Sequence, residues 1–241
     1  MAGTPNRSFA GKIAAGSPRR AFLLFEGFGQ DLGGGVFTNS RPCFHGQISQ
    51  GNAVHEFEPH SHALAGSLLL AHPSLRDPNF TQSIIFLSMQ DAEDGAFGMI
   101  LNRPSGKRLG DLMPGRDLGI LAMAPVYIGG PVATEQLLLT AFRWEEGAGM
   151  WNWRHDLTIE SAAEIVQEEG TILRVFAGYS GWSKGQLEEE LKRETWVVHT
   201  PDGALLDLEP EPEPGRWVRL LRQHGPIFEF LTSPPPNLGL N

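Results

Sequence analysis

The sequence predicts an α+β fold whose strands are mostly antiparallel. Between residues 67 and 101, three short apolar segments follow one another with only short turns between them. Parallel neighbours would need long crossover connections, so this spacing favours antiparallel pairing. From residue 161 onward, segments with helix-capping signals alternate with strand-like runs, which adds the helical part of the fold.

The first three predicted strands cover residues 67–71, 83–89 and 97–101. They are rich in leucine, isoleucine and phenylalanine, and the second has the β-branched and aromatic residues typical of strands. A turn is predicted at residues 75–79, where Asp-Pro-Asn combines a fixed φ with side chains that bond back to the main chain. Residues 91–95 end in Asp-Gly and predict a hairpin loop.

Four more strands are predicted in the second half, over residues 125–129, 136–142, 171–176 and 195–199. The first two are separated by the turn Gly-Gly-Pro at residues 129–131. The sequence therefore predicts seven strands, with no internal repeat.

Three helices are predicted, over residues 161–169, 183–194 and 215–224. The first two begin with capping boxes, in which Ser161 and Ser183 stand three residues before a glutamate or a glutamine. The third has apolar residues at the i, i+3 and i+4 spacing of an amphipathic helix.

Arginines on the third helix raise the question of nucleic-acid binding. Arg216, Arg219 and Arg222 are expected on a solvated face, opposite the apolar residues. A recognition helix would need a preceding helix and a tight turn, and here an acidic Glu-Pro run at residues 209–214 stands in front of it. Direct binding to nucleic acid is therefore disfavoured.

Composition excludes several classes of protein. The chain has 241 residues and a formal net charge of −9, so it lacks the overall basic charge of a nucleic-acid-binding protein. A single cysteine, Cys43, excludes an intrachain disulfide and a multi-thiolate zinc site. No apolar run approaches the ~20 residues that span a bilayer. We expect a cytoplasmic protein with no membrane partner.

The domain organisation is predicted from changes in composition. Residues 1–63 are rich in glycine, serine and asparagine without sustained periodicity, and we expect a flexible leader there. We expect residues 64–232 to form the α+β domain and residues 233–241, which begin with Ser233 and three prolines, to form a disordered tail. The chain is acidic, with 28 acidic and 19 basic residues.

Motifs for common chemistries are incomplete. Gly178-Tyr-Ser180-Gly-Trp182 has a tryptophan where a serine-hydrolase elbow needs its second glycine. Gly106-Lys107 lacks the other residues of a phosphate loop. The histidines around His60 lack ligands at helical spacing, so no metal or cofactor is expected.

Four separated segments nevertheless stand out together. They are Leu-Ala-His-Pro with Asp77-Pro-x-Phe80 at residues 70–83, Gly-Ala-x-Gly with Asn102-Arg103-Pro at 95–104, Tyr-Ile-Gly-Gly-Pro-Val at 127–132, and Gly-Tyr-Ser-Gly-Trp-x-x-Gly-Gln-Leu-Glu-x-Glu at 178–190, with Trp196 after it. In this order and spacing they resemble the YqgE/AlgH-type family of bacterial proteins, over residues 65 to 230. The chain departs from the family at residues 89–91, where Met-Gln-Asp stands in place of a histidine that relatives often have.

The resemblance implies a branched sheet curled into a partial barrel, with helices packed outside it. It implies no known reaction, because the family is largely uncharacterised. Some members are labelled transcriptional regulators, although no DNA-reading element is visible in the pattern, and kinship of fold is a weak guide to chemistry.

Arg103 is the predicted centre of a binding site. Pro104 pushes Arg103 into an extended conformation, so that the guanidinium can present its donors to a carboxylate or a phosphate, with Asn102 beside it. The alternative is structural: Arg103 pairs with Asp77 and buttresses the two turns. Both interpretations stay open from the sequence.

The other candidate ligand-binding residues are Gly129, Gly130, Tyr179, Trp182 and Gln186. Glycines permit close approach of a backbone, and the Tyr179–Trp182 segment is predicted just before the amino end of a helix, where free amides attract anions. Each again has a structural alternative, a sharp corner for the glycines and a core position for Trp182.

Three functional hypotheses follow. The first is a non-enzymatic binding or regulatory protein that recognises a protein or a small anionic ligand, because the motifs lack a nucleophile with its base. The second is an enzyme acting on a small anionic substrate, with Asp77 as base and Arg103 as clamp. The third is a transcription-associated regulator without a recognisable DNA-binding motif.

Overall fold

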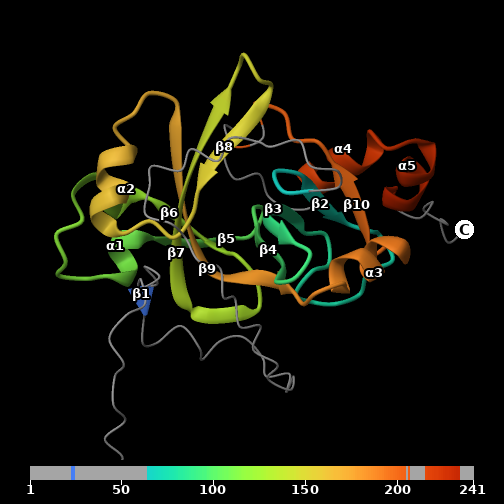
Figure 1. The fold of residues 1–241 in the computed structure, drawn as a ribbon, viewed down its shortest axis with the longest axis horizontal. Helices are drawn as coiled ribbons and strands as arrows, with labels where there is room; N and C mark the ends of the chain where they lie inside the picture. Colours follow the sequence, from blue (N-terminus) through green and yellow to red (C-terminus); the bar gives the residue numbers. More distant parts are fainter. Residues whose placement is uncertain (1–22, 25–63, 205, 207–214, 234–241) are drawn as a thin grey trace, which may run out of the picture.

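The computed structural model describes residues 23–24, 64–204, 206 and 215–233, and most of the expected leader and tail lies outside these ranges. The described residues form a ten-stranded mixed sheet that curls into a half-barrel, with helices on its outer side and at its ends (Figure 1). The predicted α+β class and the partial barrel are confirmed.

The strands are β1 (Leu23–Leu24), β2 (Leu68–Ala71), β3 (Ile84–Asp91), β4 (Gly95–Ile100), β5 (Pro104–Arg108), β6 (Pro125–Ile128), β7 (Val132–Glu145), β8 (Met150–Arg154), β9 (Thr171–Trp182) and β10 (Trp196–His199). The helices are α1 (Leu109–Leu112), the 3₁₀ helix η1 (Gly119–Met123), α2 (Ile159–Ile165), α3 (Gln186–Lys192), α4 (Gly215–Arg222) and α5 (Pro226–Thr232).

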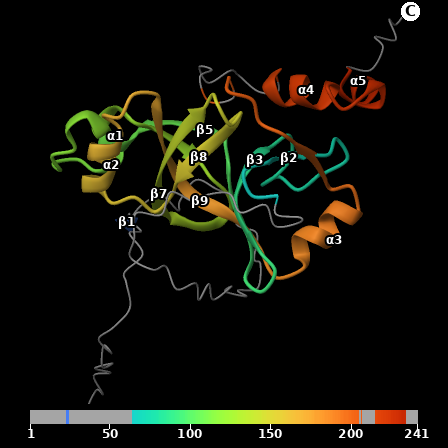
Figure 2. The ribbon, with the colours of Figure 1, turned by 45° about the horizontal axis from the view of Figure 1, so that its top comes forward.

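Strand β9 joins the two halves of the sheet. Its first part pairs with β7 and β6, and its last part pairs with β4, which continues through β3 and β2 to β10. The pairing of β6 with β9 is parallel, whereas the other strand pairs are antiparallel, as predicted for most of the sheet. In Figure 2, α1 and α2 lie at one end of the molecule, and α3, α4 and α5 lie at the other.

The β3–β4 hairpin shows how local sequence sets the register. Asp91 pairs with Gly95 across the predicted loop, and Gly95 has a φ of +90°, which favours glycine. The Asp91 carboxylate accepts hydrogen bonds from the main-chain N–H groups of Glu93 and Asp94, and these bonds lower the pKa of Asp91. The predicted hairpin is therefore confirmed.

Apolar side chains form three clusters, separated by the sheet. The interior cluster lies between the two halves of the sheet and α4, and it includes Phe86, Phe176 and Trp217. A second cluster packs α1, η1 and α2 against β7 and β9, and a third packs α3 and the 72–82 segment against β2, β3 and β4. The sheet thus has both faces covered, which explains why β2 and β4 are buried along their whole length.

Two predicted helix starts were wrong. Helix α2 begins at Ile159, because the hydroxyl of Thr158 accepts the bond from the Ser161 N–H and acts as the cap that was assigned to Ser161. Helix α3 runs only over Gln186–Lys192, and its N-cap is Gly185 with a φ of +74°. The side chain of Gln186 does accept a bond from the Ser183 N–H, so half of the predicted capping box is present.

Three further differences come from long-range packing. Residues 178–182 were predicted as a loop before a helix, but they continue β9, because Ala96, Phe97 and Gly98 of β4 pair with them. Arg216 was predicted on a solvated face, yet it is buried, since α4 covers the interior cluster. Strands β5 and β8 and helices α1 and α5 were not predicted.

Candidate functional site

The turn at Asp77 is closed by its own side chain and braced by Arg103. The Asp77 carboxylate accepts a bond from the N–H of Asn79 at 2.8 Å. The guanidinium of Arg103 donates to the carbonyl oxygens of Asn79 at 2.6 Å and Thr81 at 3.0 Å. The structure thus places Asp77 and Arg103 at one turn. The described hydrogen bonds of Arg103 go to main-chain carbonyl oxygens of that turn.

Asn102 lies two residues beyond the end of β4 and bonds through its side chain to the main chain at the start of β3. Its Oδ1 accepts from the N–H of Ile84, and its Nδ2 donates to the carbonyl of Gln82, at 2.8 and 2.9 Å. Gln82 has a φ of 56°, a strained value for a residue with a side chain. Asn102 therefore stabilises an unfavourable backbone position at the entrance to β3.

Gly129 and Gly130 are buried and lie where β6 leaves the sheet across β9. A Cβ on Gly129 would stand 2.3 Å from the carbonyl oxygen of Gly178, and one on Gly130 would stand 2.3 Å from that of Tyr179. The carbonyl oxygen of Gly129 accepts bonds from the N–H of Ile100 and from the hydroxyl of Ser180. These two glycines permit a close crossing of backbones.

Trp182 and Gln186 belong to a polar cluster around Glu190, a residue that was noted in the last family motif but was given no role. The Oε2 atom of Glu190 accepts from the indole N–H of Trp182 at 2.8 Å and from that of Trp196 at 2.7 Å. Its Oε1 accepts from the side-chain amide of Gln186 at 3.0 Å. Phe80, in the Asp77 turn, packs edge-on against Trp196.

Tyr179 lies on the opposite face of β9 from Trp182. Tyr179 packs against Phe97 at 5.1 Å between ring centroids and borders the interior cluster, whereas Trp182 belongs to the cluster under α3. The structure therefore places most of the predicted site residues along the ends of β3, β4 and β6, namely Asp77, Asn102, Arg103, Gly129 and Gly130. Trp182 and Gln186 connect to this group through Phe80, whereas Tyr179 lies apart. The described polar contacts of these residues are to other parts of the fold.

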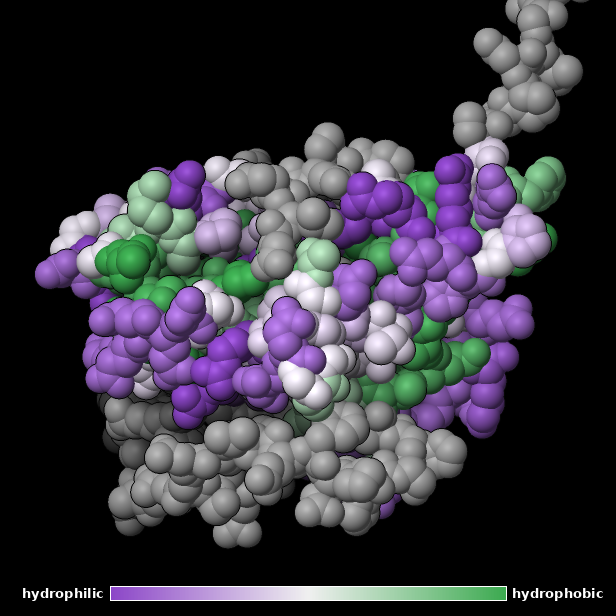
Figure 3. Space-filling model, turned by 90° about the horizontal axis from the view of Figure 1, so that it is seen from above, coloured by the Kyte–Doolittle hydropathy of each residue, from purple (hydrophilic) through white to green (hydrophobic). Residues whose placement is uncertain are grey.

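A surface with a different character is formed by α4 and α5, which we call the α4–α5 hairpin (residues 215–232). Helix α5 exposes three large apolar side chains, Ile227 at 58%, Phe230 at 77% and Leu231 at 43%. Their i, i+3 and i+4 spacing puts them on one helix face. In Figure 3, apolar residues reach the surface at the end of the molecule where α5 lies.

Basic side chains accompany this apolar face. Arg219 and Arg222 are exposed on α4, and Nε of Arg222 donates to the hydroxyl of Thr232 at the end of α5. Glu229 is the one acidic residue within the hairpin, against three arginines. The hairpin is therefore locally basic on a chain with a net charge of −9.

The hairpin is held firmly to the sheet. The indole N–H of Trp217 donates to the carbonyl of Ala71 at 2.9 Å, and Leu220 and Leu221 are buried in the interior cluster. A histidine pair adds a second attachment, because Nδ1 of His199 on β10 lies 2.9 Å from Nε2 of His224. Burial and the neighbouring His224 both lower the pKa of His199.

The sequence contained a signal for α5 that the analysis missed. Gly225-Pro226 is a typical helix start, since proline is favoured at the first helical position, and Ile227, Phe230 and Leu231 have helical spacing. An apolar face of this kind is usually assigned to a core, so its exposure could not be predicted from the pattern alone.

The described residues contain neither a metal-binding cluster nor a membrane-spanning helix. Within the described ranges, no group of three or more histidine, cysteine, aspartate or glutamate residues could hold a metal ion. Among the same residues, no helix is long and apolar enough to cross a membrane.

Comparison with known proteins identifies the family. The AlgH-like family model matches residues 68–229, which contain the turn, the glycine crossing, the Glu190 cluster and most of the hairpin. The chain belongs to the AlgH-like family. This confirms the resemblance inferred from the sequence.

Two AlgH-like relatives have names that state no activity. The chain is 31% identical to a UPF0301 protein of Thermobifida fusca over 195 residues, which cover 74% of this chain and 96% of the relative. It is 34% identical to the UPF0301 protein SCO2948 of Streptomyces coelicolor over 192 residues, again 74% of this chain and 96% of the relative.

Two solved structures share the fold. The crystal structure of protein DIP2367 from Corynebacterium diphtheriae superposes with a TM-score of 0.57 at 19% identity, covering 73% of this chain and 95% of that one. The solution structure of the AlgH protein from Pseudomonas aeruginosa has a TM-score of 0.52 at 25% identity, with 75% and 99% covered.

Proposed function

We propose that this AlgH-like chain is a non-enzymatic binding protein and that the α4–α5 hairpin is the surface on which it docks a regulated partner protein. The observation that supports this proposal is the exposure of Ile227, Phe230 and Leu231 on one face of α5. Exposed groups of large apolar residues on a soluble domain mark interaction sites, because leaving them in water is unfavourable.

Charge gives the chemistry of the partner. Arg222 is exposed on α4 and lies beside α5, since its Nε donates to the hydroxyl of Thr232. Phenylalanine and arginine are both enriched at protein interfaces. The partner therefore presents an apolar stripe with acidic residues beside it, as an amphipathic acidic helix does.

The predicted motif residues support a binding role in another way. The described donors and acceptors of Asn102 and Trp182 are used inside the fold, and Asp77 and Arg103 form one turn. A clamp for a substrate needs donors directed at the substrate. We therefore place recognition on the hairpin, and prefer the binding protein to an enzyme that uses Asp77 and Arg103.

Site-specific photo-crosslinking tests the proposal. A benzophenone amino acid at position 230 should give a discrete adduct with another protein in cells, and Arg222→Glu should weaken it several-fold. The matched control is the same probe at Ile120, which is 66% exposed on η1. Equal adducts from both positions, or an adduct only with a second copy of the chain, would overturn the proposal.

A further inference from the structure

Arg174 is a buried arginine inside the half-barrel. It lies on β9 and is 4% exposed. Its chain neighbours Leu173 and Val175 belong to the cluster under α2, whereas Phe176 belongs to the interior cluster. Because side chains alternate along a strand, Arg174 faces the interior.

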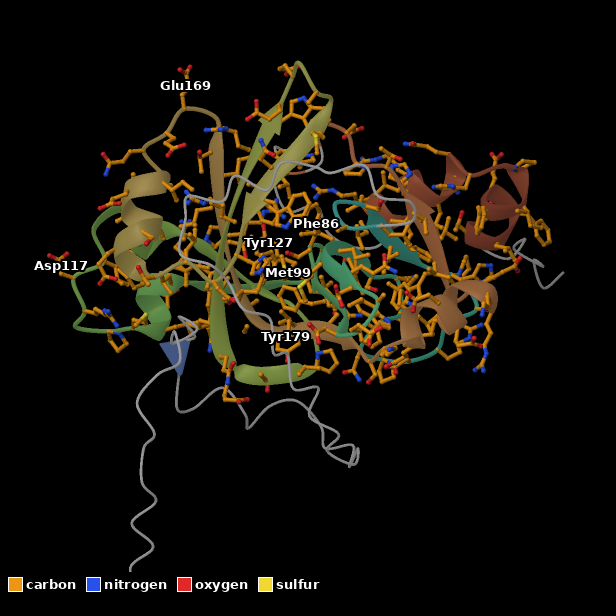
Figure 4. All side chains as sticks on the ribbon, viewed as in Figure 1. Phe86, Met99, Asp117, Tyr127, Glu169 and Tyr179 are labelled. Carbon is orange, nitrogen blue, oxygen red and sulfur yellow. The ribbon has the colours of Figure 1, made fainter. Side chains whose placement is uncertain are left out.

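The partners of Arg174 in the described part of the chain are neutral. Its Nη2 donates to the carbonyl of Leu206 at 3.2 Å, and its Nη1 contacts the carbonyl of Leu101 at 3.5 Å. Its Cζ lies 4.7 Å from the centre of the Tyr127 ring. Figure 4 shows Tyr127 in the middle of the molecule near Met99 and Phe86, whereas Asp117 and Glu169 lie at its edges.

The guanidinium of Arg174 has more N–H donors than it has acceptors around it. Arginine has five N–H donors, and two carbonyl oxygens accept from it here, one of them at the limit of hydrogen-bond distance. The ion pairs between described residues all join exposed side chains, and none includes Arg174. Burying a charge without an opposite charge is costly.

A second cation lies near Arg174. Arg216 of α4 is also buried, at 8% exposure. Burial lowers the pKa of Arg174, and the neighbouring Arg216 lowers it further, although Tyr127 opposes the shift. The surroundings of Arg174 thus disfavour its charged form, which an oxyanion beside it would stabilise.

A hydroxyl group completes the cluster. Thr140 of β7 lies directly opposite Arg174 in the sheet register, so the two side chains are on the same face. The Thr140 side chain is 0% exposed, and its Oγ1 has no hydrogen-bond partner among the residues described. Such an unsatisfied group costs stability that an incoming acceptor would recover.

We propose that Arg174 and Thr140 form a binding site for the oxyanion group, a carboxylate or a phosphate, of a small ligand inside the half-barrel. A planar guanidinium binds either group through two parallel N–H bonds, and the hydroxyl of Thr140 donates a third. The ring of Tyr127 packs against the guanidinium. The site is separate from the docking surface, and neither inference rests on the other.

Thermal unfolding of the full chain tests the site with two probes, inorganic phosphate and acetate, each compared with sodium chloride at equal ionic strength. A ligand that binds only the folded state raises Tm by mass action, and the rise continues with concentration according to its Kd. We expect phosphate or acetate to raise Tm more than chloride does. The anion that does so shows whether the site prefers a phosphate or a carboxylate group.

Two variants assign the effect. Thr140→Val keeps the shape of the side chain and removes the unsatisfied hydroxyl. This variant should fold, and its affinity for the oxyanion should be at least several-fold lower. Arg174→Gln should abolish the effect, and Arg116→Ala, on an exposed loop, should leave it unchanged. No Tm rise beyond chloride, or the same rise in Thr140→Val as in the unmodified chain, would overturn the proposal even if Arg174→Gln does not fold.

Discussion

The carboxylate of Glu190 on α3 accepts a hydrogen bond from the indole N–H of Trp182 on β9, with 2.8 Å between Oε2 and Nε1. The same oxygen accepts from Trp196, the first residue of β10, at 2.7 Å. Both tryptophans are buried and their rings meet edge to face at 5.9 Å. One carboxylate oxygen therefore connects a helix with two strands that are not neighbours in the sheet.

Glu190→Ala should destabilise the protein by ~2–4 kcal/mol, because two buried indole N–H groups lose their acceptor. Urea unfolding monitored by tryptophan fluorescence measures the change. The matched control is Glu189→Ala, which removes an exposed pair with Lys192 and should change stability by less than about 0.5 kcal/mol. Equal effects of the two substitutions would contradict this role of Glu190.

Gly129→Ala should be destabilising by about 3 kcal/mol, since the new methyl group would stand 2.3 Å from the Gly178 carbonyl oxygen and the crossing backbones would have to separate. Gly147→Ala is the control, because that position has open space around it. Chemical denaturation of both variants checks the difference, and a stable Gly129→Ala protein would show that the crossing can relax.

Asn102→Ala should cost about 1–3 kcal/mol, because the main-chain N–H of Ile84 and the carbonyl of Gln82 lose their side-chain partner. Asn102→Asp retains the acceptor for Ile84 but places a carboxylate oxygen against the Gln82 carbonyl, so it should also destabilise. Hydrogen exchange at the Ile84 amide should be faster in Asn102→Ala, and much less affected in Asn102→Asp, which keeps an acceptor for that amide. Unchanged protection there in Asn102→Ala would refute the assignment.

Acid should loosen the α4–α5 hairpin. The pKa of His199 is lowered from 6.5 by burial and by His224, so the folded protein favours the neutral ring more than the unfolded chain does, although Asp202 opposes the shift. Stability from this site is complete above pH 6.5 and is lost as the pH falls below that value. The ring of His224 also lies near Phe228, which packs against His72.

The measurement is Tm against pH from 7.5 to 5 for the unmodified chain and for His224→Gln. Because His224 is one cause of the lowered pKa of His199, its replacement should bring that pKa closer to its ordinary value, and His224→Gln should lose less stability on acidification. Parallel Tm curves for the two proteins would mean that the histidine pair does not contribute to the pH dependence.

Local signals predicted the fold well where the chain pairs with its immediate neighbour. The 67–101 segment became β2, β3 and β4 because each strand is followed by a turn whose residues determine the geometry, as at Asp91 and Gly95. The prediction for residues 178–182 was wrong because glycine-rich sequence is typical of loops. Here β4, about 80 positions earlier in the sequence, supplies a strand partner.

The candidate site was harder to predict than the fold. Sequence alone could name Arg103 and Asp77 but could not say that Arg103 would bond to main-chain carbonyls. The sequence predicted Arg216 on a solvated face, whereas it is buried. Helical periodicity identifies the apolar face of a helix but not the elements that cover the residues beside that face. Arg174 and Thr140 share no motif, and their proximity comes only from the β7–β9 register.

Strand β9 has one further consequence. Its twelve residues are hydrogen-bonded to β6 and β7 at one end and to β4 at the other. A fragment that contains one half of the sheet without β9 would leave unpaired the strand edges that β9 now covers. We therefore expect the two halves of the sheet to unfold in a single cooperative transition.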